Sequence, residues 1–222
     1  MKPAARWLLI ACAALVLQQL CVAQMGMGMR PPDITGVFNP TVGSGSSYEM
    51  VKKEGGEKTT FDMAVVDKDS SGGYWIEYGF QSPQMHGTVY SKTLLVRQKD
   101  DIVIQRMIMQ IPGHPPMDMS TMMSMKGMQS AKERADFRAD AENLGTESVT
   151  TPAGTFECQH WRSKKDGNDI WISDKVSPWK LVKMTGPNNS MTLVRVITDA
   201  KSHITGTPVS MEEMMKQRMG QQ

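Results

Sequence analysis

The sequence predicts a mainly β protein: a strongly curved antiparallel sheet, or open half-barrel, with a helical lid inserted in mid-chain and a C-terminal helix. Three observations support this fold class. Many short segments alternate apolar and polar residues with a period of two, and turn residues separate them. Two segments, about 118–141 and 209–222, break this alternation with helical features. The chain that follows the N-terminal signal has the length of one domain.

Residues 1–23 have the features of an export signal peptide. Lys2 and Arg6 provide a charged start, residues 7–17 form a short apolar run, and Cys21-Val22-Ala23 places small residues at the cleavage site. No later segment reaches the roughly 20 apolar residues that a membrane helix requires. We therefore expect a protein exported to the periplasm or cell envelope, without a transmembrane segment after cleavage.

Residues 24–47 are predicted to be a flexible arm, because they contain Met-Gly repeats, Pro31-Pro32 and a Gly-Ser run. Removal of the signal leaves equal numbers of basic and acidic residues, so the mature chain has no net charge. A neutral chain lacks the basic surface that nucleic acids require. Nucleic acid is therefore excluded as a partner.

Residues 48–208 are predicted to form the sheet domain. Turn residues such as Lys165-Asp166-Gly167 separate its strands. The strands alternate apolar and polar residues, as antiparallel strands with one buried face do. Further strands are expected at 167–173, 179–184 and 190–198. The residues predicted to share a strand face are Phe61, Met63 and Val65; Tyr74, Ile76, Tyr78 and Phe80; Met107, Met109 and Ile111; and Phe156, Cys158 and His160.

The two predicted helices differ in their sequence signals. The inserted segment, about 118–141, contains regularly spaced alanines and many charges. The C-terminal segment 209–222 opens with Ser210 and Glu213, which have the spacing of a capping box. Its four methionines fall within an arc of about 140° at 100° per residue, as an amphipathic helix requires.

Methionine is the most unusual feature of the composition, with 21 in 222 residues. The methionines of residues 117–128 would spread over about 240° of a helix, so no single core-facing stripe uses them all. Such a segment is either an adaptable apolar flap or a source of metal ligands, because thioethers repack easily and also favour Cu(I). The candidate copper ligands are Met25, Met27, Met29, His114, Met117 and Met119.

The sequence contains no catalytic motif. It lacks Gly-x-Ser-x-Gly, His-Glu-x-x-His and a phosphate-binding glycine loop. We therefore expect a protein that is not an enzyme and has no cofactor, copper being the alternative.

One stretch carries a family resemblance. Residues 149–158 read VTTPAGTFEC and are followed by Trp171-Ile172-Ser173 and by Leu-Val-Lys-Met at 181–184. This order resembles exported bacterial proteins of the DUF4412 type, which look like members of the superfamily of LolA and LppX lipoprotein carriers. The resemblance covers about residues 48–198. It implies a curved half-barrel whose apolar concave face is closed by helices and, in the carriers, holds acyl chains. The methionine-rich flap departs from the carriers.

The leading hypothesis is a non-enzymatic binding protein for a lipid or another apolar ligand. Alternation alone leaves open which strand face is concave. The alternatives are a Cu(I)-binding or Cu(I)-buffering protein and a structural or interaction protein that binds other envelope proteins. The candidate lining residues are Phe61, Met63, Tyr74, Ile76, Tyr78, Met107 and Met109, with Met119, Met122, Met123 and Met125 on the lid.

Overall fold

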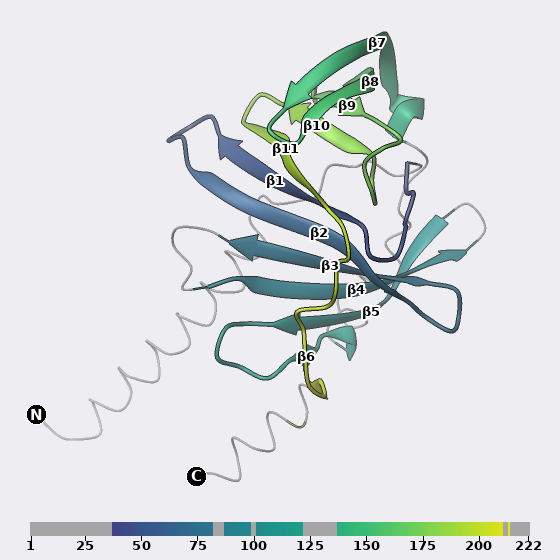
Figure 1. Cartoon of the computed structure of the whole chain (residues 1–222), viewed down its shortest axis with the longest axis vertical. Helices are drawn as coiled ribbons and strands as arrows, with labels where there is room; N and C mark the ends of the chain where they lie inside the picture. Colours follow the sequence, from purple (N-terminus) through teal and green to yellow (C-terminus); the bar gives the residue numbers. More distant parts are fainter. Residues whose placement is uncertain (1–36, 82–86, 99–100, 122–136, 211–212, 214–222) are drawn as a thin grey trace, which may run out of the picture. The chain divides into compact units, whose positions relative to one another are not determined.

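The described part of the chain is mostly β, and its strands form one large, open and curved sheet (Figure 1). The computed structural model describes residues 37–81, 87–98, 101–121, 137–210 and 213. The elements are β1 (Gly45–Lys52), β2 (Lys58–Lys68), β3 (Tyr74–Gln81), β4 (Val89–Gln98), β5 (Asp101–Gln110), β6 (Met117–Asp118), the short 3-10 helix η2 (Phe137–Asp140), β7 (Ala141–Thr151), β8 (Gly154–Ser163), β9 (Asp169–Ile172), β10 (Leu181–Thr185), β11 (Asn189–Ile197) and β12 (Val209–Ser210).

The described residues contribute 12 strands to the sheet, in the order β12-β6-β5-β4-β3-β2-β1-β11-β10-β9-β8-β7. Neighbouring strands of the two hairpin series, β1–β6 and β7–β11, are antiparallel. The two series join where β1 pairs with β11, from Gly45 opposite Ile197 to Lys52 opposite Asn189. The described strands β6 and β12 run parallel to each other. The sheet therefore depends on a pairing between segments that are far apart in the sequence.

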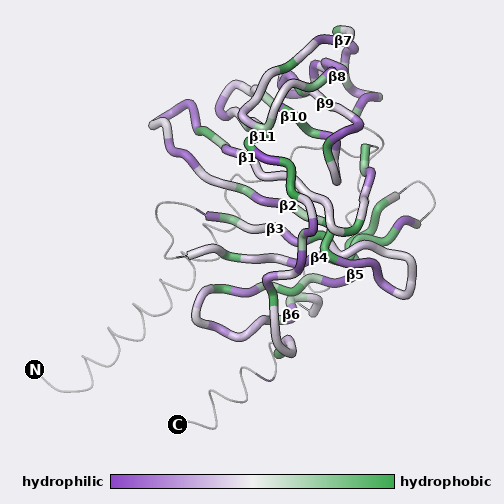
Figure 2. The backbone as a smooth tube through the Cα atoms, in the orientation of Figure 1, coloured by the Kyte–Doolittle hydropathy of each residue, from purple (hydrophilic) through white to green (hydrophobic). Residues whose placement is uncertain are grey.

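Irregular pairing accounts for the curvature of the sheet. Within the described strands, the register shifts in five ladders: β1–β11, β2–β3, β4–β5, β7–β8 and β9–β10. Each such bulge bends its strand and increases the local twist. Figure 2 shows hydrophobic and hydrophilic stretches interleaved along the strands, as alternation between two faces requires.

The hydrophobic core lies where the two hairpin series meet. Tyr48, Phe61, Met63, Leu181 and Leu193 are fully or almost fully buried there. The Tyr48 hydroxyl donates a hydrogen bond of 2.8 Å to the Leu181 carbonyl, which joins β1 to β10. Burial raises the pKa of the Tyr48 phenol far above its usual value, so Tyr48 is a neutral part of the core.

Two irregular segments cover this part of the core. Phe38 packs on Trp179 with ring centroids 4.6 Å apart and meets Tyr74 edge-on at 6.1 Å. The Asn39 amide donates to the Pro178 carbonyl at 2.7 Å. The segment after residue 36 and the loop between β9 and β10 therefore close one end of the core.

The predicted helices are only partly within the described residues. Of the predicted lid at 118–141, residues 122–136 lie outside them. Asp118 belongs to β6 and Ala141 to β7, so the prediction is wrong at these two residues, whereas Ser120 and Thr121 are helical and Phe137–Asp140 form the single 3-10 turn η2. Val209 and Ser210 form β12 rather than helix because they pair with β6. The capping box is present: the Ser210 amide donates to Glu213 Oε2 at 2.8 Å, and the Glu213 amide donates to Ser210 Oγ at 3.1 Å.

The boundaries of the arm and two strands also differ from the prediction. The signal and most of the arm lie outside the described residues, but Gly45, Ser46 and Ser47 belong to β1. Ser46 and Ser47 are buried, and the Ser46 hydroxyl donates to the Ser177 carbonyl at 2.6 Å. Strands β4 and β7 were not predicted. Strand β4 has apolar residues on both faces, and β7 is a largely exposed edge strand, so neither alternates clearly.

Candidate functional site

The sheet register places all seven candidate lining residues of the strands on one face, which we name the apolar face. Residues that are directly opposite in neighbouring strands point to the same side of a sheet. Met63 lies opposite Tyr78, Tyr78 opposite Ser91, and Ser91 opposite Met109. The remaining candidates follow by alternation and pairing along the same strands. They are Phe61, Tyr74, Ile76 and Met107.

The apolar face is buried at one end and half-buried at the other. Phe61, Met63 and Ile76 are at most 2% exposed and belong to the core. Toward β6 and the edge strand β12, the side chains are half-buried and retain access to solvent. These half-buried apolar side chains are Tyr74, Tyr78, Phe80, Ile104, Met107, Met109, Met117 and Met119. Three of the candidate lining residues are therefore core residues, and four lie in the accessible part.

Aromatic contacts connect the two ends of the apolar face. Phe61 stacks on Tyr78 with centroids 5.9 Å apart and contacts Phe80 at 4.8 Å. Tyr48 lies 6.3 Å from Phe61 on its other side. The half-buried aromatic rings of β3 therefore rest on a rigid base.

Small polar residues lie between the large side chains of this face. Ser91 and Thr93 on β4 are buried, and they lie between Tyr78 and Ile76 on β3 and the methionines of β5. Ser91 and Thr93 were not among the predicted lining residues, because strand β4 was not predicted. Their small size leaves room above β4 for the longer neighbouring side chains.

The opposite face of the same strands is covered by the segment 199–208, which we name the strap. Figure 1 shows the chain after β11 crossing strands β2 to β5 on its way to β12. Within the strap, Ile204 is buried, and His203 stacks on Tyr90 with ring centroids 4.5 Å apart. Leu94 and Ile108, whose side chains point to this face, are also buried. The strap therefore covers part of this face, on which Trp75 and Tyr90 are half-buried.

Glu77 anchors the strap. Its side chain is 3% exposed and accepts hydrogen bonds from Ser202 Oγ at 2.6 Å and from the His203 amide at 2.8 Å. The His203 ring Nδ1 also lies 2.8 Å from Glu77 Oε1. Sequence reasoning missed this contact because it joins residues 126 positions apart. Nothing in the local pattern of β3 distinguishes Glu77 from a solvated strand residue.

The candidate copper ligands do not all fall within the described residues. Met25, Met27 and Met29 lie outside them, as do the lid candidates Met122, Met123 and Met125. His114 lies in the exposed turn between β5 and β6, where its amide donates to the Ile111 carbonyl at 3.0 Å. Met117 and Met119 lie beside Met109 and Met107 on the apolar face.

The other titratable groups of interest have structural partners. Cys158 is 1% exposed, and burial raises the pKa of its thiol to about 11. His160 Nδ1 lies 2.9 Å from Glu147 Oε1, and its Nε2 lies 3.1 Å from Asp169 Oδ1. Although burial opposes its ionisation, Asp169 has a pKa below the usual value because Arg162 and His160 hydrogen-bond to it. Among the described residues, no group of three His, Cys, Asp or Glu side chains could hold a metal ion.

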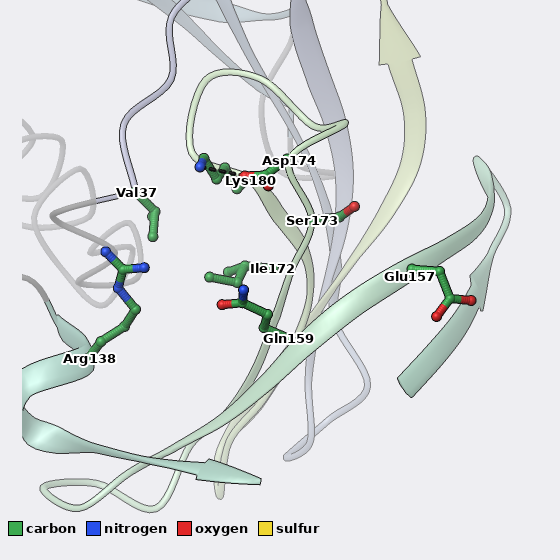
Figure 3. Close-up of a pocket in the computed structure, with 8 residues that line it drawn as sticks. All are labelled: Val37, Arg138, Glu157, Gln159, Ile172, Ser173, Asp174 and Lys180. Carbon is green, nitrogen blue, oxygen red and sulfur yellow. Dashed lines mark ion pairs between the residues drawn. The ribbon is translucent and has the colours of Figure 1, made fainter. Parts of the chain in front are cut away.

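A polar pocket of about 200 Å³ lies elsewhere in the sheet, against β8 and β9. Figure 3 shows Arg138 pointing toward Val37 and Gln159, while Glu157 points away from the other side chains. Lys180 Nζ lies 2.5 Å from Asp174 Oδ1, so these two charges compensate each other. This charged lining does not suit an acyl chain. The residues that line the pocket are Val37, Arg138, Glu157, Gln159, Ile172, Ser173, Asp174 and Lys180.

Within the described part of the chain, no helix has the length and apolarity needed to cross a membrane.

Comparison with known proteins gives low similarity throughout. No family model and no curated protein matches the sequence. A predicted lipoprotein of Parabacteroides distasonis ATCC 8503 is 16% identical, with a TM-score of 0.36 over 73% of this chain and 98% of that protein. A predicted exported protein with a YmcC-like fold, from Bacteroides fragilis NCTC 9343, is 14% identical, with a TM-score of 0.38 over 72% and 98%. A DUF1329 family protein from Desulfovibrio piger ATCC 29098 is 12% identical, with a TM-score of 0.31 over 71% and 85%. At these TM-scores the likenesses carry no argument about function.

Proposed function

We propose that this chain is an exported, non-enzymatic binding protein that holds an apolar ligand, such as an acyl chain, on the accessible part of its apolar face. The observation that carries the proposal is the row of half-buried apolar side chains from Tyr78 on β3 to Met117 on β6. The signal-like residues 1–23 support export.

The strap supports the choice of this face. The strap crosses the other face, where Leu94 and Ile108 are buried, and Glu77 fixes it there. A ligand on that side would have to displace the strap and leave a buried carboxylate without its donors, which is unfavourable. A ligand on the apolar face would leave the strap and its hydrogen bonds with Glu77 in place.

The chemistry of the lining fits a chain-like apolar ligand. Each buried methylene contributes about 0.8 kcal/mol, so a long chain can be held without a specific polar contact. Methionine side chains adapt to irregular apolar partners. Tyr78 and Phe80 add flat surfaces that are fixed by Phe61.

Two experiments test this proposal. Protein purified from its native source should yield lipid on organic extraction and mass spectrometry. Purified full chain should also bind a fluorescent fatty acid, and Met109→Lys should weaken that binding at least tenfold, because loss of contact with two methylenes already costs about 1.6 kcal/mol. Leu144→Lys is the matched control, since Leu144 is a 39% exposed apolar residue on β7 at the other edge of the sheet.

Absence of both extracted lipid and fatty-acid binding would overturn the proposal. Equal binding by Met109→Lys and wild type would also overturn it, because the ligand would then lie elsewhere. Recovery of an envelope protein without lipid would favour the interaction-protein alternative instead.

A further inference from the structure

Four methionines gather on strands β5 and β6 and the residue after β6, near the β12 edge of the sheet. Met109 lies directly opposite Met117 in the antiparallel ladder. The Met119 amide donates a hydrogen bond of 2.9 Å to the Met107 carbonyl, so the same register continues by two residues and places Met119 opposite Met107. All four side chains therefore point to the apolar face. We name them the methionine quartet.

The spacing of the quartet suits a shared ligand. Cβ atoms of directly opposite residues are about 4.5–5.5 Å apart, and diagonal neighbours are about 7–8 Å apart. A methionine side chain is unbranched, with three rotatable bonds. Thioethers from both strands can therefore reach a common point above the hairpin.

The backbone beneath the quartet is fixed on both sides. On the opposite face, Arg106 Nε donates to Asp118 Oδ2 at 2.9 Å, which ties β5 to β6. Asp118 Oδ1 also accepts from the Ser120 amide at 2.9 Å. The outer edge of β6 pairs with β12, where the Val209 amide donates to the Pro116 carbonyl at 2.9 Å. The two-residue strand β6 is thus held by the strands on both of its sides, β5 and β12.

The surroundings favour a soft, uncharged ligand set. The nearest partners on β4 are Ser91 opposite Met109 and Thr93 opposite Met107, both small. The charged residues Arg106 and Asp118 alternate onto the other face. All four methionines are half-buried, so solvent reaches them.

A second group of methionines provides an internal comparison. Met50 lies opposite Met191, and Met191 lies opposite Met184, across β1, β11 and β10. Met191 and Met184 are 2% and 6% exposed and belong to the core. Methionines that are adjacent across strands are therefore used in two ways in this sheet, one buried and one accessible.

We propose that the methionine quartet, Met107, Met109, Met117 and Met119, binds one Cu(I) ion through its thioethers. Soft thioether ligands select Cu(I) over harder divalent metals, and they need no deprotonation to bind it. The site is independent of the proposed acyl-chain function, although the two ligands would meet at the same edge of the apolar face. His114 is not among its ligands, because it lies in the exposed turn.

The test is an anaerobic titration of the full chain with Cu(I) against bathocuproine disulfonate as competitor. Wild type should bind one tight equivalent, and X-ray absorption should show sulfur as the only ligand type. Replacing all four quartet residues by Leu should weaken the site at least 100-fold. Met50→Leu is the matched control and should leave it unchanged, since Met50 lies on the same face but on β1.

Leucine substitution nearly conserves volume and polarity, so the variants should remain folded. If thermal melting shows that the fourfold variant is unfolded, the double variant Met109→Leu/Met117→Leu takes its place. This double variant should weaken Cu(I) binding at least tenfold. Absence of a tight equivalent in wild type overturns the proposal. Undiminished binding by the folded Leu variant also overturns it, because other methionines would then hold the metal.

The two proposals fail separately. The fourfold Leu variant keeps an apolar face and should still bind the fluorescent fatty acid, whereas Met109→Lys should lose both ligands. Loss of Cu(I) binding with retained fatty-acid binding therefore identifies the thioethers, and not the general apolarity of the face, as the metal ligands.

Discussion

Replacing Glu77 should release the strap and destabilise the sheet. Glu77 is buried and accepts two short hydrogen bonds from Ser202 Oγ and the His203 amide, and a third contact from the His203 ring. Hydrogen bonds to a charged group contribute about 1.5–3 kcal/mol, and a buried donor left without a partner costs about 1–3 kcal/mol. The His203 side chain is 63% exposed, so water can replace its ring contact.

We therefore expect Glu77→Ala to lower the free energy of unfolding by about 3 kcal/mol. For a domain of this size, that loss corresponds to a fall in Tm of about 6–12 °C. Glu77→Gln should lose less, because its amide oxygen can still accept from one donor. The assay is thermal unfolding followed by circular dichroism, together with limited trypsin digestion at Lys201 in the exposed part of the strap.

Glu49→Ala is the control for removing a glutamate from a strand of this sheet. Glu49 is 42% exposed and pairs with Lys58 at 3.2 Å, so its loss should change stability by no more than about 0.5 kcal/mol. Equal stability and equal trypsin sensitivity of Glu77→Ala and Glu49→Ala would show that the Glu77 carboxylate does not anchor the strap.

Three further predictions concern the rest of the sheet. Gly45→Ala should lower the urea midpoint, with a loss of about 1–3 kcal/mol, because an added Cβ would lie 2.7 Å from the Ala64 Cβ; an unchanged midpoint would contradict the close approach of β1 and β2. Asp169→Asn should be less stable than wild type at neutral pH, because the pKa of Asp169 is lowered on folding by its bonds with Arg162 and His160. The stability that an acid with a lowered pKa provides is lost as the pH falls through its folded pKa. The urea midpoints of Asp169→Asn and wild type should therefore converge below about pH 4. A difference between the midpoints that stays constant with pH would argue against the ion pair. The buried Cys158 thiol, with a pKa of about 11, should react with Ellman's reagent at pH 8 only after denaturation; rapid reaction of native protein would show that it is accessible.

Period-two alternation predicted the strands that have one covered and one polar face. Strands β2 and β3 are of this kind. Their register places Met63 directly opposite Tyr78 and next to Phe61 on the same face. Alternation failed for β4, since Leu94 and Leu95 are buried on opposite faces, one toward the strap and one toward the core. It failed for β7 because an exposed edge strand has no reason to alternate.

Glycine and serine misled the prediction at the start of the sheet. A Gly-Ser run is typical of linkers, but Gly45 belongs to strand β1. The position requires glycine because the neighbouring backbone of β2 leaves no space for a side chain. Ser46 is buried beside it and finds its hydrogen-bond partner in the loop before Trp179. No local pattern could indicate this, because the partner is 131 residues away.

Local sequence patterns were sufficient to predict the β class of the fold, the period of its strands, the capping box at Ser210 and the concentration of methionine near residue 117. These features depend on neighbours within a few residues, which the chain carries wherever it folds. Three other features emerge only in the folded chain: β1 pairs with β11, the strap crosses one face of the sheet, and Met107 and Met109 lie opposite Met119 and Met117. Strand register and long-range pairing are set by which surfaces can be buried together, and that depends on the whole sheet at once.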